Sequence, residues 1–161
     1  IARYSTSKVL IGAQLSLQAN SDAMKYLASG FIRVLDECKH ELNQNDHILS
    51  DLYHFWKLEY ATLTRDTGCA IICMSKKLNL LDGQGLMHHE NAQEFAVKHG
   101  ADADLASKLV TTIHSCERQY TSMSDECSRM LEVAKCFRTG IKELHWNQKV
   151  DVIVTEILEE I

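Results

Sequence analysis

Proline is absent from this chain of 161 residues, and glycine occurs only seven times. Because proline interrupts helices and glycine favours turns, nothing local prevents long helices. A many-stranded fold usually needs more turn residues than this. No apolar run is long enough to cross a membrane as a helix. The formal net charge of -5 argues against a nucleic-acid partner, whose phosphates the protein would repel.

The length suits one domain with a core and an internal cavity. With 45% hydrophobic and 24% charged residues, the composition is typical of a globular protein and not of a disordered one. We find no internal repeat, low-complexity run or linker. The sequence therefore predicts a single domain.

The first nineteen residues have the order of a secretory signal peptide. Arg3 and Lys8 precede the short apolar run 9–13, and small Ala19 closes the segment. Gln14 and Ser16 interrupt the apolar part, so a signal-peptide remnant and an N-terminal extension are both open interpretations. In either case we expect the folded domain to cover residues 20–161 and the protein to be secreted.

From Asn20 onward the apolar residues recur at three- and four-residue steps, the period of amphipathic helices. The predicted segments are 24–42, 46–56, 64–76, 88–100, 102–120, 124–140 and 150–161. Thr64, Asp102 and Ser124 are expected N-caps, and Gly100 and Gly140 are expected near helix ends. Asp82-Gly83 within residues 79–85 indicates a turn.

The six cysteines are Cys38, Cys69, Cys73, Cys116, Cys127 and Cys136. An even number favours three disulfides and an oxidising compartment, although buried free thiols are an alternative. Cys69 and Cys73 lie one helical turn apart, so each can tie the same helix to a different neighbour. Zinc is disfavoured because it needs four ligands in close pairs and the other cysteines are dispersed. Sequence alone leaves the pairing undetermined.

Short stretches around these cysteines resemble those of the six-cysteine insect odorant-binding proteins, and most closely the moth pheromone-binding proteins. The matching stretches are 35–38, 55–57, 67–71, 88–92, 94–96, 98–102, 136–137 and 156–158. The resemblance covers residues 20–161. It implies an all-α fold of six to seven helices around an internal apolar cavity, with disulfides Cys38–Cys73, Cys69–Cys127 and Cys116–Cys136.

By this resemblance, the expected function is that of a secreted carrier in the sensillum lymph. It would bind long-chain alcohols, aldehydes or acetates of the pheromone type and deliver them to sensory neurons. There are two alternatives. One is a general carrier of plant volatiles, and the other is a secreted structural or protein-binding module whose interior is filled by packed core residues. Further candidate partners are an olfactory receptor, the neuronal membrane surface, and a second copy in a weak pH-dependent dimer. We expect no cofactor or metal, and no enzymatic activity, because no nucleophile elbow, phosphate loop or acid pair stands out.

Periodicity alone would assign the aromatic residues to core packing. The resemblance implies instead that they line the ligand chamber with other apolar residues. The implied wall is Met24, Phe31, Phe55, Trp56, Ile71, Leu80, Leu81, Met87, Phe95, Val110, Ile113, Val133 and Phe137. Ser75 is implied to hydrogen-bond the ligand head, whereas a bond to its own backbone is the simpler interpretation.

The segment 150–161 carries an apolar stripe but also Asp151 and Glu160. A helix docked permanently on the surface is one interpretation. The resemblance implies that the tail enters the chamber in acid and displaces the ligand. Burial favours neutral carboxyls, so falling pH would favour the inserted form. His88, His89 and His114 would gain charge in mildly acid solution and loosen the chamber's covering loop.

Overall fold

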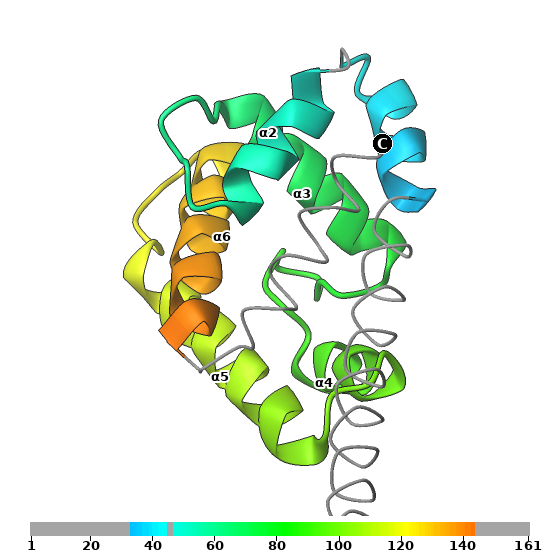
Figure 1. Cartoon of the computed structure of the whole chain (residues 1–161), viewed down its shortest axis with the longest axis vertical. Coiled ribbons are helices and arrows are strands. Elements are labelled where there is room, and N and C mark those ends of the chain that lie inside the picture. The colour runs from blue at the N-terminus through cyan, green and yellow to red at the C-terminus, as the bar shows by residue number, and fades with distance from the viewer. Residues whose placement is uncertain (1–32, 45–46, 144–161) are drawn as a thin grey trace, which may run out of the picture.

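The computed structural model describes residues 33–44 and 47–143. Residues 33–41 are helical, and five further helices follow (Figure 1): α2 (His47–Trp56), α3 (Arg65–Lys77), α4 (His89–Lys98), α5 (Ala103–Gln119) and α6 (Glu126–Glu143). The β pairing within these ranges is one antiparallel bridge between Leu81 and Met87. The predicted all-α fold is confirmed. No helix in the described part is both long and apolar enough to span a bilayer.

Several helix boundaries follow from the predicted local signals. Thr64 precedes α3, and its backbone N–H donates to the Thr67 hydroxyl at 3.3 Å. The Asp102 carboxylate accepts from the Leu105 N–H at 2.8 Å and so caps α5. After α4, Gly100 has φ of 103°, a left-handed conformation that glycine adopts without a Cβ penalty.

Helix α6 departs from the prediction at both ends. Asp125 and not Ser124 is the N-cap, because its carboxylate accepts from the Ser128 N–H at 2.8 Å and its carbonyl from the Arg129 N–H at 2.9 Å. The helix also continues past Gly140 to Glu143. Gly140 is not among the positive-φ glycines, so it continues the helix and does not terminate it.

Three disulfides join the helices in the implied pairing. Cys38–Cys73 ties the segment 33–41 to α3, with Cα atoms 5.9 Å apart, and Cys69–Cys127 ties α3 to α6 at 4.6 Å. Cys116–Cys136 ties α5 to α6 at 5.7 Å. No free cysteine is left in the described part of the chain. Helix α3 is therefore crosslinked on two sides, and α6 likewise.

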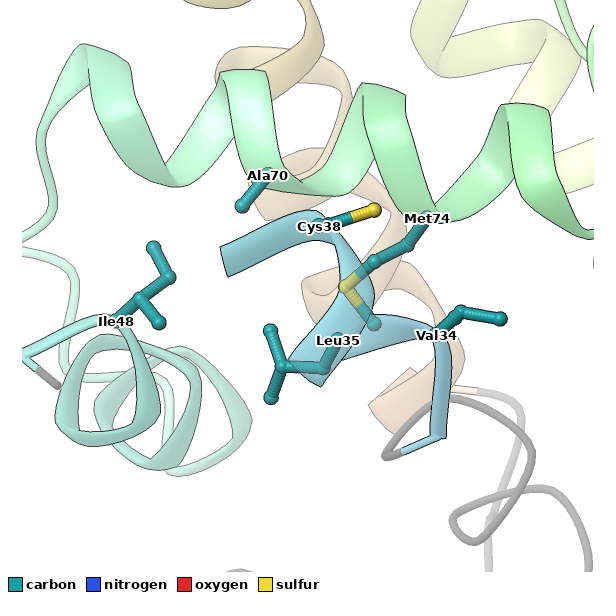
Figure 2. Close-up of a cluster of buried hydrophobic side chains, with 6 residues drawn as sticks. All are labelled: Val34, Leu35, Cys38, Ile48, Ala70 and Met74. Atoms are coloured by element: carbon teal, nitrogen blue, oxygen red, sulfur yellow. The ribbon is translucent and has the colours of Figure 1, made fainter. Parts of the chain in front are cut away.

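One face of α3 forms a hydrophobic core with the helices that precede it. Figure 2 shows Val34, Leu35 and Cys38 on the segment 33–41, facing Ala70 and Met74 of α3, while Ile48 joins them from α2. Ala70 and Met74 lie four residues apart, so both project from the same face of α3. None of the implied ligand-binding residues within the described ranges belongs to this core cluster. The implied ligand residues of α3, Ile71 and Ser75, lie on the neighbouring face of the helix.

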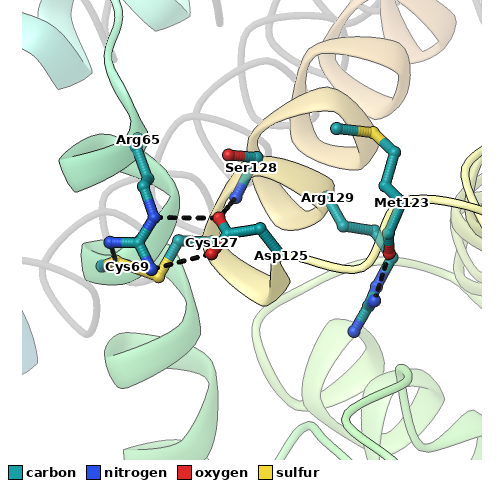
Figure 3. Close-up of polar contacts among 7 residues, drawn as sticks. All are labelled: Arg65, Cys69, Met123, Asp125, Cys127, Ser128 and Arg129. Carbon is teal, nitrogen blue, oxygen red and sulfur yellow. Dashed lines mark hydrogen bonds and ion pairs between the residues drawn. A yellow bond between two sulfur atoms is a disulfide. The ribbon is translucent and has the colours of Figure 1, made fainter.

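A bidentate ion pair lies beside the α3–α6 disulfide (Figure 3). Nε and Nη2 of Arg65 each lie 2.9 Å from a carboxylate oxygen of Asp125, and Nη1 lies 3.6 Å from Sγ of Cys69. The pKa of Asp125 is lowered, first by the hydrogen bond from Arg65 and then by those from Ser128. The same carboxylate thus caps α6 and binds α3.

We expect this ion pair to make stability depend on pH. The pKa of Asp125 lies below its ordinary value of 3.8. The contribution of the ion pair to stability is therefore complete above about pH 3.8 and is lost as the pH falls further below it. Asp125→Asn keeps a good cap but removes the charge. The unfolding free energy, measured by urea titration, should therefore fall less between pH 5 and pH 2 in this variant than in the wild type.

The matched control is Asp104→Asn on α5, where the carboxylate is 77% exposed and pairs with Lys108 of the same helix. That substitution is expected to leave the pH dependence as it is in the wild type. An Asp125→Asn protein with an unchanged pH dependence would contradict the assigned role of the ion pair.

Candidate ligand site

The loop between α3 and α4 is the first part of the candidate site. Leu81 and Met87 pair across it, and the His88 N–H donates to the Leu80 carbonyl at 2.7 Å. At its tip, the Asp82 carboxylate accepts from the N–H groups of Gln84 and Leu86, as in an Asx turn. The predicted turn is confirmed. Three implied wall residues, Leu80, Leu81 and Met87, are thereby held together.

Ser75 lies in the last turns of α3 and is 5% exposed. Ile71 is half-buried one turn earlier on the same face. Ser75 and Ile71 thus lie together on one face of α3, where a hydrogen bond from a ligand to the Ser75 hydroxyl would contribute about 0.5–1.5 kcal/mol.

The end of α2 contributes Phe55 and Trp56, both half-buried. The Phe55 ring lies 6.3 Å from the ring of Tyr60, whose hydroxyl lies 2.9 Å from the Thr139 hydroxyl of α6. The Trp56 Nε1–H is buried and has no acceptor among the described residues. One polar group among the implied ligand residues of the described part is thus left without a partner.

Helices α4, α5 and α6 carry the remaining implied wall residues of the described part. Phe95 of α4 is half-buried, and its ring lies 4.2 Å from that of His99. Val110 of α5 and Val133 of α6 are buried, whereas Ile113 and Phe137 are half-buried. None of the implied wall residues in the described part is among the exposed large hydrophobics, which are Leu42, Leu86 and Val97.

Several predictions fall on residues outside the described ranges. These are the leader or extension 1–19, the wall residues Met24 and Phe31, the tail 150–161, and the switch residues Asp151 and Glu160.

Two of the three switch histidines, His89 and His114, lie side by side. Their rings are stacked, with centroids 5.6 Å apart and planes at 6°. His114 Nδ1 lies 2.7 Å from one carboxylate oxygen of Glu117, and the other oxygen accepts from the Met87 N–H at 2.8 Å. Glu117 therefore connects α5 to the α3–α4 loop, a role that the sequence analysis did not assign.

The third histidine, His88, is the N-cap of α4. Its Nδ1 accepts from the Asn91 N–H at 3.2 Å, so this nitrogen carries no proton. Protonation would remove the acceptor and place a positive charge at a helix N-terminus, where it is unfavourable. The cap is thus compatible only with one protonation state of His88.

A pocket of about 190 Å³ lies between the α3–α4 loop, the end of α3 and the start of α6. It is lined by Ile72, Lys76, Leu81, Asp82, Gly83, Gln84, Gly85, Leu86, Glu117, Glu126, Arg129, Met130 and Val133. Only Leu81 and Val133 were implied as ligand residues. The pocket has several charged side chains and is smaller than the roughly 300 Å³ at which ligand pockets begin. It does not suit a long alkyl chain.

No group of ligands able to hold a metal ion occurs in the described ranges.

The fold and the site place this chain in the class of small helical proteins whose helices are linked by disulfides. Half-buried apolar side chains lie on several of these helices. The chain matches the PBP/GOBP family over residues 21–140. It is 39% identical to Pheromone-binding protein 2 of Epiphyas postvittana over 153 residues, which are 95% of this chain and 93% of that protein. General odorant-binding protein 2 of Heliothis virescens is 35% identical over 127 residues, 79% of this chain and 78% of that protein.

A solved structure agrees with these similarities. The crystal structure of Epiphyas postvittana pheromone binding protein 3 aligns with a TM-score of 0.69 and 55% identity, over 71% of this chain and 98% of that one. The chain therefore belongs to the PBP/GOBP family, and the predicted resemblance to moth pheromone-binding proteins is confirmed.

Proposed function

We propose that this protein is a secreted carrier that binds and solubilises long-chain apolar ligands of the pheromone type and delivers them to sensory neurons. The observation that carries the proposal is its similarity to Pheromone-binding protein 2 over nearly the whole of both chains. The implied wall residues support it, since those described are buried or half-buried on six different parts of the fold, namely five helices and the α3–α4 loop. The relatives are named as binding proteins, which gives no support for catalysis.

In this proposal, the alkyl chain supplies most of the affinity, at about 0.8 kcal/mol for each buried methylene. The head group is oriented by Ser75, and the Trp56 Nε1–H is a second donor within the same set of residues. Such an oxygen-bearing head satisfies polar atoms that otherwise lose hydrogen bonds on burial. An alcohol, an aldehyde and an acetate all offer an oxygen acceptor.

We expect Ser75→Ala to change the ranking of head groups. The alanine removes a hydroxyl and leaves the apolar wall intact, so a ligand that bonds to Ser75 should bind about 5- to 10-fold more weakly. An alkane of the same length should be unaffected. Displacement of a fluorescent apolar probe by matched alcohols, aldehydes, acetates and alkanes measures the ranking.

Ser115→Ala on α5 is the matched control, because this serine is not among the implied ligand residues. If Ser75→Ala preserved the order and spacing of the four affinities, Ser75 would not contact the head group. If the wild type bound none of the four ligands, the carrier function itself would be wrong.

We further propose that acid releases the ligand. Protonation of His88 removes the cap of α4, and protonation of His89 and His114 places two positive charges in stacked rings. Glu117 partly offsets the charge on His114, but the repulsion from His89 remains. These changes weaken the α3–α4 loop that carries Leu80, Leu81 and Met87. The segment 150–161, with Asp151 and Glu160 neutralised, would then occupy the chamber.

Deletion of residues 150–161 tests the second half of this proposal. We expect the truncated protein to retain its probe at pH 5, where the full-length protein releases it, and to bind equally well at pH 7. Probe fluorescence measured between pH 7 and pH 4.5 distinguishes the two. Equal release from both proteins would show that the tail is not the displacing segment.

A general carrier of plant volatiles is the second candidate function, favoured by the similarity to General odorant-binding protein 2. Competition between long-chain acetates and shorter plant alcohols separates the two functions. The carrier proposal also includes a delivery target, which is an olfactory receptor or the neuronal membrane. It places the protein in the sensillum lymph, as a monomer or a weak pH-dependent dimer.

A further inference from the structure

Arg138 is a buried charged residue in the middle of α6, with only 3% of its surface exposed. It lies on the stripe formed by Leu131, Ala134 and Ile141, which are also buried. A guanidinium at such a position loses its hydration, so its contacts within the protein must compensate for that cost. Two contacts in the structure join it to the same residue, Trp56.

The first contact is with the Trp56 backbone. Helix α2 ends at Trp56, and the last carbonyls of a helix lack partners within it. The backbone carbonyls of Tyr53, His54 and Phe55 accept hydrogen bonds from the N–H groups of the turn that follows α2. The Trp56 carbonyl accepts from Arg138 Nε at 2.9 Å. A cation at a helix C-terminus also interacts favourably with the helix dipole.

The second contact is with the Trp56 side chain. The Arg138 guanidinium carbon lies 4.2 Å from the centre of the indole ring, a cation–π arrangement that is strongest where water is excluded. A single contact to the carbonyl would leave the indole free to turn about its side-chain bonds. Because Arg138 contacts both the carbonyl and the ring face, rotation of the indole would break the second contact.

We propose that Arg138 is a positioning residue, which fixes the Trp56 indole in the wall of the ligand site and thereby sets the affinity for apolar ligands. The proposal rests on the carrier function proposed above. Arg138 acts through Trp56 and does not itself contact the ligand. Neither lysine nor methionine can replace it, because only a planar guanidinium can donate to the carbonyl and stack on the ring together.

The test uses the full-length protein with Trp146→Phe, since the chain has two tryptophans and Trp56 then emits alone. Arg138→Met, Arg138→Lys and the exposed control Arg118→Met are compared, each checked for folding by far-UV circular dichroism. We expect Arg138→Met to change the Trp56 emission and near-UV dichroism without any ligand. It should weaken binding of N-phenyl-1-naphthylamine about fivefold or more. Arg118→Met should do neither.

A double-mutant cycle separates positioning from a general structural role. In a Trp56→Leu background, Arg138→Met should change probe affinity less than about twofold, because its target is absent. An equal loss of affinity in both backgrounds would overturn the proposal. If Arg138→Met does not fold, Arg138→Lys decides: wild-type emission and affinity in that variant overturn the proposal, and loss of both supports it. Failure of the wild type to bind the probe contradicts the carrier function, and the ligand-free emission still reports on Arg138.

Discussion

Replacement of both Cys69 and Cys127 by alanine is expected to lower the unfolding free energy by about 4 kcal/mol. The bond spans 58 residues, the longest of the three separations, so its loss frees the most conformational entropy in the unfolded chain. It also joins α3 to α6, the helix pair with the most extensive contacts in the described part. Urea denaturation followed by far-UV circular dichroism measures the change.

The control is the double replacement of Cys116 and Cys136, which span 20 residues. The same argument gives a loss of about 3 kcal/mol for this pair. A smaller loss for Cys69 and Cys127 than for the control would contradict the loop-length argument. Full reduction of the native protein should combine these losses, and binding of an apolar probe should disappear with the fold.

The parts of the fold that depend on local chemistry could be predicted from the sequence. The caps at Thr64 and Asp102 and the left-handed Gly100 involve groups within four residues of each other. The start of α6 could not be predicted in this way, because both Ser124 and Asp125 are good caps. Asp125 has the additional partner Arg65, which is 60 residues away in sequence. Only the tertiary fold brings that partner to it.

The same limit applies to the candidate site. Ser75 and Trp56 were singled out through resemblance, but Glu117 and Arg138 were missed, since their roles depend on partners in other elements. A signal for both was present in the sequence. Arg138 follows Leu131 and Ala134 at helical spacing, and Glu117 follows Val110 and Ile113 in the same way. A charged residue on an apolar stripe indicates a buried partner.

The second large effect is expected at Gly68, one residue before the α3–α6 disulfide. A Cβ atom there would overlap the Cys127 carbonyl oxygen, which belongs to the backbone and is held by the disulfide of the same residue. Gly68→Ala must therefore force α3 and α6 apart. We expect a loss of about 3 kcal/mol or more in unfolding free energy, at the upper end for overpacking.

Gly140→Ala is the matched control, because Gly140 is also a helical glycine in the interface of two helices. There, among the described residues, the added methyl would meet the Thr112 methyl group at 2.8 Å, which is a side-chain atom and not backbone, and Thr112 can turn away only by breaking the 2.7 Å bond from its hydroxyl to the Lys108 carbonyl. Alanine gains about 1 kcal/mol of helix propensity over glycine, which is similar to the roughly 0.5–1.5 kcal/mol of the hydrogen bond lost in that movement. Denaturation of both variants should thus show a severe loss for Gly68→Ala and a change within about 1 kcal/mol for Gly140→Ala. Similar values for the two would mean that α3 and α6 are not in backbone contact at the disulfide, and that their separation is set by side chains alone.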